Sequence, residues 1–142
     1  MKVKLNSCFY SSFIFLTNVF AGFYYYQILY TYVYLYLFLT SVYYHSSYRR
    51  LAYFLDQIGC VMGGCYSFYL AVDHFFRLSS PEMTYFVLYM GCLFYTIASY
   101  YLGRVWRMFS HHPDKRVGNY FHSVLHIVAS LGCNAALYLS MH

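Results

Sequence analysis

The sequence predicts an all-α protein: a polytopic bundle of transmembrane helices with about five spans, forming a single transmembrane domain over residues 1–142. Hydrophobic residues make up 61% of the chain and charged residues only 9%, whereas roughly 25% of the residues in an ordinary globular protein are charged. Uncharged apolar runs long enough to cross a bilayer recur along the chain, and short polar segments separate them. We therefore expect a multi-pass integral membrane protein.

The first apolar run is too long for one span. Between Leu5 and Tyr48, only His45 can carry a charge. A single helix over this run would be about 65 Å long, about twice the ~30 Å thickness of the hydrocarbon core. We therefore expect the run to break near Asn18–Gly22. The two resulting spans are expected at about Leu5–Phe20 and Phe23–His45.

The amino-terminal segment also resembles a secretory signal peptide. It has a basic start, an apolar centre and small residues at Ala21 and Gly22. Retention as the first helix is the preferred interpretation, and cleavage of residues 1–21 would leave four spans. The second span runs in the same direction in either case.

Three more spans follow, and polar segments separate them. They are expected at about Leu51–Val72, Thr84–Leu102 and Tyr120–Met141. The segment Asp73–Met83 is expected to be a loop in which Pro81 begins the next helix, since proline suits the first turn. The segment Gly103–Asn119 is polar, contains Pro113 and is expected to be a second loop.

The basic residues predict the orientation in the membrane. If each span crosses once, one side of the membrane carries eight of the nine basic residues and the other side carries only Arg77. The eight are Lys2, Lys4, Arg49, Arg50, Arg104, Arg107, Lys115 and Arg116. Because cytoplasmic loops are enriched in Lys and Arg, the side with eight is expected to be cytoplasmic. These residues form no dense basic stripe, so the net charge of +5 does not indicate a nucleic-acid partner.

The five cysteines all lie inside apolar runs. They are Cys8, Cys60, Cys65, Cys92 and Cys133. A disulfide framework or a zinc–thiolate site would show short spacings in loops. We interpret the cysteines as small buried residues.

Four ionisable residues are expected at similar depth in the membrane. His45 ends the second span, Asp56 lies early in the third, and His122 and His126 lie one helical turn apart early in the fifth. A charged group at the centre of a span costs about 2.5–3.5 kcal/mol, so such groups usually face a partner or a cavity. Three imidazoles are a suitable ligand set for a catalytic Zn²⁺ with a fourth position open. The pattern predicts one zinc site near the cytoplasmic side.

Each of these residues also has a simpler interpretation when taken alone. A membrane histidine can be a hydrogen-bonded packing residue, and Asp56 could pair with Arg49 or Arg50. Ser41, one turn before His45 on the same helix face, could bond to the helix backbone. Only the combination on one side of the membrane favours a metal site.

Other polar and small residues are expected to lie outside the site. His74 and His142 fall near the opposite side or the terminus, and His111 and His112 are expected in a solvated loop. The G-x-x-x-G motif at Gly59–Gly63 indicates close helix packing.

In order and spacing, these residues resemble a known family. The stretches are SVYYH at Ser41–His45, LDQ with Asp56 eleven residues after His45, and FHSVLHIVASLG at Phe121–Gly132. They resemble the alkaline ceramidases and, more broadly, the superfamily that includes the adiponectin receptors and hemolysin III-like proteins. In that superfamily a Ser-x3-His ends one span, an Asp opens the next, and a His-x3-His opens the last. The resemblance covers about a third of the chain, within Ser41–Gly64 and Phe121–Tyr138.

The resemblance implies a zinc-dependent amidohydrolase and a role for each residue. His45, His122 and His126 would bind Zn²⁺, Asp56 would hold and deprotonate the attacking water, and Ser41 would help to stabilise the oxyanion. The substrate would be a membrane lipid amide such as a ceramide, entering from the bilayer. The superfamily has seven spans. Loss of two consecutive spans between Asp56 and His122 would preserve the direction of the last one.

The sequence departs from the ceramidases in one further respect. Ceramidases carry acidic residues near the amino terminus for calcium, and no Asp or Glu precedes Asp56 here. Two other functions remain open at this point. One is a metal-holding, receptor-like protein without turnover, and the other is a structural or pore-forming protein whose polar residues only pack helices.

Overall fold

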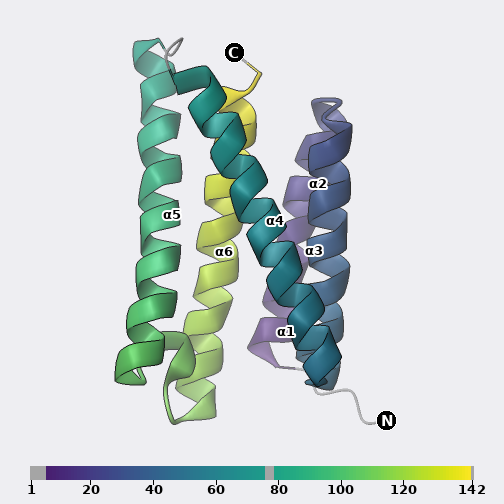
Figure 1. The fold of residues 1–142 in the computed structure, drawn as a ribbon, viewed down its shortest axis with the longest axis vertical. Coiled ribbons are helices and arrows are strands. Elements are labelled where there is room, and N and C mark those ends of the chain that lie inside the picture. Colours follow the sequence, from purple (N-terminus) through teal and green to yellow (C-terminus); the bar gives the residue numbers. More distant parts are fainter. Residues whose placement is uncertain (1–5, 76–78, 142) are drawn as a thin grey trace.

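A computed structural model describes residues 6–75 and 79–141, which are almost entirely helical and contain no strand. The all-α prediction is confirmed for this part of the chain. The helices run alternately up and down and pack side by side (Figure 1). The amino-terminal segment consists of α1 (Ser7–Ser11), a short 3-10 helix (Ser12–Ile14) and α2 (Phe15–Tyr24). Four longer helices follow: α3 (Ile28–Ser47), α4 (Arg50–His74), α5 (Ser80–Trp106) and α6 (Lys115–Leu139).

The break in the first apolar run lies further along the chain than predicted. The expectation of a break near Asn18–Gly22 was wrong, because α2 continues through these residues to Tyr24. The Asn18 amide is buried and satisfied by distant partners: its Nδ2 donates to the Tyr30 hydroxyl at 2.8 Å and to the Ser130 carbonyl at 3.1 Å. The turn instead contains Tyr26, whose φ of 56° lies in the left-handed region.

Gly22 serves close packing instead of breaking the helix. A Cβ atom at this position would lie 2.5 Å from Oγ1 of Thr31 and 3.1 Å from its backbone nitrogen. A hydrogen in place of a side chain therefore allows α2 and α3 to approach each other directly after the turn. Gly59 does the same between α4 and α3, where a Cβ would lie 3.1 Å from Cδ1 of Leu37, as the G-x-x-x-G motif predicted.

The loops are shorter than predicted because the helices extend into their charged ends. Helix α5 begins with Pro81 in its first turn and a capping box between Ser79 and Glu82, and it continues to Trp106. The expected loop Gly103–Asn119 therefore shrinks to residues 107–114, and it includes a 3-10 helix at Phe109–His111. Charged side chains at an exposed helix end remain in water and do not require a loop.

The basic residues gather at one end of the bundle. The α3–α4 connection, the α5–α6 connection and the start of α1 lie at the lower end in Figure 1, and the α4–α5 connection lies at the upper end. Six described basic residues lie in the lower connections or at the helix ends beside them: Arg49, Arg50, Arg104, Arg107, Lys115 and Arg116. Lys2, Lys4 and Arg77 lie outside the described residues.

Two of the five cysteines are not buried, so that prediction was wrong for them. Cys8 and Cys92 are buried and Cys133 is half-buried, but Cys60 and Cys65 on α4 are exposed, and Cys60 lines the cavity between the helices. All five are free thiols, as expected. An apolar position in such a chain can face the outside of the bundle as readily as its interior.

Two helical segments are long and apolar enough to cross a membrane by length and composition: Pro81–His111 and Lys115–Leu139. Helix α3 is 20 residues long, which corresponds to about 30 Å and matches the hydrocarbon thickness. Its six tyrosines lower its mean hydropathy because each carries a hydroxyl group. The structure thus supports two candidate spans, fewer than the five predicted.

Candidate metal centre

Three of the predicted residues meet at the lower end of the bundle. One ring nitrogen from each of His45, His122 and His126 lies within 4.8 Å of the other two. The ring centroids are 5.0 Å apart for His45 and His122, 5.2 Å for His45 and His126, and 4.8 Å for His122 and His126. The three rings therefore form a compact triangle. The predicted ligand set is the set that the fold brings together.

Two helices supply the three histidines. His122 and His126 lie one turn apart on α6, so both rings project from the same face. His45 lies in the last turn of α3, which ends at Tyr48 in the left-handed conformation with φ 52°. His45 is 3% exposed and His126 is 8% exposed, while His122 is half-buried. The helix geometry thus places the rings inside the bundle.

Aromatic side chains limit how the histidine rings can turn. The Tyr44 ring lies 4.7 Å from the His45 ring, and the Phe15 ring lies 5.1 Å from the His126 ring, measured between centroids. These contacts come from α3 and α2. They surround the triangle with apolar surface on two sides.

The donor set fits a Zn²⁺ ion. Nε2 of His45 is buried without a hydrogen-bond partner among the described residues, and such a group in a protein interior costs about 1–3 kcal/mol. A cation would satisfy this lone pair. Nitrogens that share one tetrahedral zinc lie roughly 3.3 Å apart, so modest rotations of rings whose nitrogens lie within 4.8 Å of one another would bring all three into range.

Asp56 lines the same cavity as His122 and His126 but is not a member of the triangle. It projects from α4 and is 3% exposed, yet it does not join the group of three mutually close ligand atoms. Its Oδ1 is buried without a hydrogen-bond partner in the described part of the chain. A carboxylate oxygen with no partner, close to a cation site, is suited to accept a proton from a substrate or water.

Ser41 interacts with two residues of the site, Ser12 and Asp56. Its side chain is fully buried, its Oγ lies 3.0 Å from Oγ of Ser12, and it interacts with the Asp56 carboxyl group. It does not line the cavity described below. The contacts of Ser41 therefore favour a role in orienting Asp56 over direct contact with an oxyanion.

A cavity of about 380 Å³ is lined mainly by residues of α4, α5 and α6, with smaller contributions from α2 and α3. Its volume falls within the ~300–1,000 Å³ range of small-molecule sites. His122, His126 and Asp56 are among its lining residues. Most of the remaining lining is apolar, including Val61, Leu93, Ile97, Leu125 and Ala129. The cavity thus joins a cluster of ionisable groups to an apolar chamber.

Two serines at the site were missed by the sequence analysis. Oγ of Ser11 lies 2.8 Å from Nδ1 of His126, and Ser12 contacts Ser41. The consecutive hydroxyls in an apolar first span were the available signal. Their partners lie 115 and 29 residues away in sequence, so no local pattern connected them.

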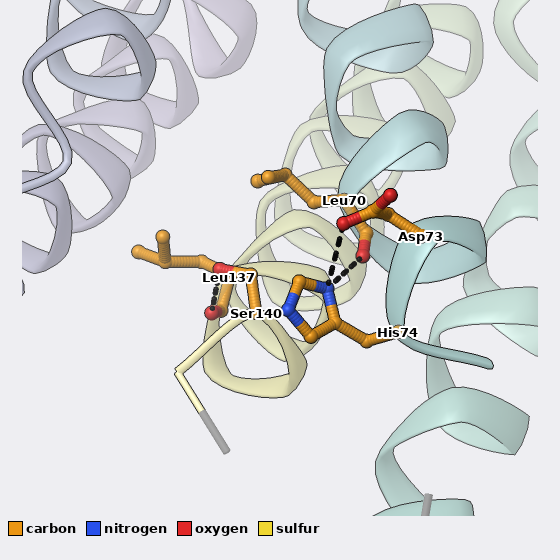
Figure 2. A network of polar contacts seen from close by, with 5 residues as sticks. All are labelled: Leu70, Asp73, His74, Leu137 and Ser140. Carbon is orange, nitrogen blue, oxygen red and sulfur yellow. Dashed lines mark hydrogen bonds and ion pairs between the residues drawn. The ribbon is translucent and has the colours of Figure 1, made fainter. Parts of the chain in front are cut away.

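The remaining histidines are not members of the triangle, although His111 is near enough to His122 to interact with it electrostatically. His111 is half-buried with its ring 5.1 Å from the Tyr100 ring, so it is less solvated than expected, and His112 is exposed. His74 ends α4, and its Nδ1 lies 3.2 Å from the Leu70 carbonyl and 3.7 Å from Oδ2 of Asp73, near the end of α6 (Figure 2). His142 lies outside the described residues.

No protein-family model, curated protein or solved structure matches this chain. The resemblance to the ceramidase superfamily therefore rests on the order and spacing of its motifs alone.

Proposed function

We propose that this chain is a zinc-dependent integral-membrane hydrolase that cleaves a lipid amide such as a ceramide. The observation that carries the proposal is the convergence of His45, His122 and His126, two of which, His122 and His126, line an apolar cavity that Asp56 also lines. A structural histidine needs one hydrogen-bond partner. Three mutually close imidazoles, one with a buried unpartnered nitrogen, are better explained by a shared cation.

The three histidines would hold the zinc, and Asp56 would stay outside the ligand set. Zinc, when bound, supplies a Lewis acid that strengthens water as a nucleophile near neutral pH and polarises an amide carbonyl. Three neutral imidazoles leave the full charge of the cation uncompensated. The positive charge would favour the ionised form of the Asp56 carboxylate, and the ionised carboxylate can accept a proton.

The chain's own groups can carry the proton through amide hydrolysis. Asp56 accepts one proton from water at Oδ1 as the water oxygen bonds to the amide carbon. The carbon–nitrogen bond then breaks, and Asp56 returns the proton to the leaving nitrogen, which departs as an amine. The second water proton remains with the carboxylic acid product. Ser41, in contact with Asp56, would hold the carboxyl group in the orientation that both transfers need.

The cavity favours a substrate with a long apolar part. Its wall is mostly apolar and comes mainly from α4, α5 and α6, and Asp56, His122 and His126 add polar groups to it. A lipid amide presents the same arrangement, since its polar amide is attached to an acyl chain. The acyl chain would occupy the apolar chamber and bring the amide to Asp56.

The proposed membrane placement has the α3–α4 and α5–α6 connections in the cytoplasm and the helices crossing as a multi-pass bundle. Support comes from the alternating helix directions, the two candidate spans and the six described basic residues near the lower connections (Figure 1). The metal centre lies towards that end, because His45 is in the last turn of α3 and His122 is early in α6.

Cysteine labelling tests this orientation. In a variant without the native cysteines, Lys115→Cys is expected to resist an impermeant thiol reagent added outside intact cells and to react after permeabilisation. Asp73→Cys, at the opposite end of the bundle, is the matched control and is expected to react in intact cells. Ready external labelling at position 115 together with protection at position 73 would reverse the orientation.

Turnover of a ceramide tests the proposed activity. Purified zinc-loaded protein in detergent is expected to release fatty acid from a long-chain ceramide, as measured by mass spectrometry. A zinc chelator should stop the release, and added zinc should restore it. Stoichiometric zinc without release from any long-chain amide would overturn the hydrolase and favour the receptor-like alternative.

A further inference from the structure

The amino-terminal helix α1 connects the two helices that carry the histidines. The side-chain amide of Asn6, its N-cap, donates to the Tyr48 hydroxyl at the end of α3. The Cys8 thiol donates to the Asn119 carbonyl near the start of α6, at 3.3 Å. Helix α1 is therefore held against both ligand-bearing helices at the level of the metal centre.

From this position, Ser11 reaches one of the candidate ligands. Its Oγ lies 2.8 Å from Nδ1 of His126 and 3.1 Å from the Cys8 carbonyl oxygen. A serine hydroxyl has one hydrogen to donate and lone pairs to accept with. The Cys8 carbonyl can only accept, and Ser11 can donate its hydrogen there. The hydroxyl oxygen is then free to accept a hydrogen bond from Nδ1–H of His126.

This arrangement selects one tautomer of His126. With the hydrogen on Nδ1, Nδ1–H of His126 donates to Oγ of Ser11, and the Ser11 hydroxyl donates to the Cys8 carbonyl. Each of these groups then has a partner. The lone pair then resides on Nε2. Histidines that bind metals commonly donate their other ring N–H in this way, which fixes ring orientation and raises ligand basicity.

We propose that Ser11 is a positioning residue of the metal centre: it accepts a hydrogen bond from Nδ1–H of His126 and makes Nε2 the nitrogen that binds zinc. The inference rests on the proposed zinc site and adds a role for the amino-terminal helix. Ser11 touches neither the ion nor the substrate and acts through His126 alone.

Zinc affinity of three variants tests this role. Ser11→Ala is expected to weaken zinc binding about 10–100-fold, the usual cost of losing such a partner, as measured by competition with a chelator of known affinity. Ser11→Thr keeps the hydroxyl and is expected to restore affinity. Thr17→Val is the matched control, because Thr17 also donates to the carbonyl three residues earlier, at 2.7 Å, but its hydroxyl contacts Ser130 of α6 instead of a histidine. Its zinc affinity should stay at the wild-type level.

Nitrogen-15 NMR of labelled histidines supplies a readout that a loss of packing would not produce. In zinc-bound wild type, His126 should show a protonated Nδ1 and a metal-bound Nε2, assigned by comparison with His126→Ala. Zinc on Nδ1 of His126, or wild-type affinity in Ser11→Ala, would overturn the inference while leaving the zinc site intact. Absence of zinc binding by the wild type would instead overturn the proposed function itself.

Discussion

Replacing Asp56 with asparagine is expected to lower lipid-amide hydrolysis about 10²–10⁴-fold, the usual loss when a general base is removed, while zinc stays bound. Asparagine keeps the shape of the side chain and one carbonyl oxygen but cannot accept a proton at neutral pH. Asp56 lies outside the mutually close ligand group, so the ion should keep its three nitrogens. Fatty acid release and zinc content would be measured on the same purified sample.

Asp73→Asn is the matched control for this experiment. It makes the same chemical change on the same helix, but at the exposed opposite end, where the carboxylate lies 3.7 Å from His74 (Figure 2). Hydrolysis should be unchanged in this variant. Ser41→Ala should cost no more than Asp56→Asn, since it removes a contact to the base and not the base itself. Loss of zinc in Asp56→Asn would make Asp56 a ligand and contradict the assigned mechanism.

Replacing His122 with alanine is expected to have the largest effect on the metal. Removal of one of three protein ligands should weaken zinc binding more than the ~10–100-fold that losing an outer partner costs, and hydrolysis should fall to background. His45→Ala and His126→Ala should behave alike, because the three rings are arranged nearly symmetrically at 4.8–5.2 Å. Competition with a chelator would rank the zinc affinities of these three variants and of Ser11→Ala.

His74→Ala serves as the histidine control. His74 is half-buried and packs against the Leu70 carbonyl at the other end of α4, so its loss should leave zinc affinity unchanged. Wild-type affinity in His122→Ala would mean that His122 only packs against its neighbours. An equal loss of affinity in His74→Ala would point to general destabilisation of the bundle.

The histidine cluster could be predicted from sequence because its signals are local. His122 and His126 share a helix face through their spacing, and His45 and Asp56 fall at matching depth in consecutive spans. The cost of isolated charges in an apolar chain then favours bringing them together. The structure adds the geometry, including the unpartnered Nε2 of His45.

Other features depend on partners that no local pattern reveals. Asn18 looked like a helix breaker, but its amide is satisfied by Tyr30 and by Ser130, which is 112 residues away. Ser11 looked like an ordinary polar residue in a first span, but its hydroxyl meets a histidine 115 residues away. The number of spans also could not be fixed, because tyrosine-rich helices such as α3 combine a suitable length with modest hydropathy.

The lack of a local signal for helix contacts also explains why the burial of two cysteines was wrongly predicted. Hydropathy marked Cys60 and Cys65 as apolar positions, and both lie on α4 as expected, but both are exposed, Cys60 at the wall of the cavity. In a membrane protein the outward surface is as apolar as the interior, so composition cannot separate the two. Helix contacts are needed to decide which face is covered.

Metal content of the purified chain tests the central claim most directly. Elemental analysis of wild-type protein, prepared with zinc in the medium and washed free of loosely bound ions, should give one zinc per chain. The double variant His122→Ala/His126→Ala should give almost none. Stoichiometric zinc that survives in the double variant would contradict the three-histidine site, and with it the proposed hydrolase.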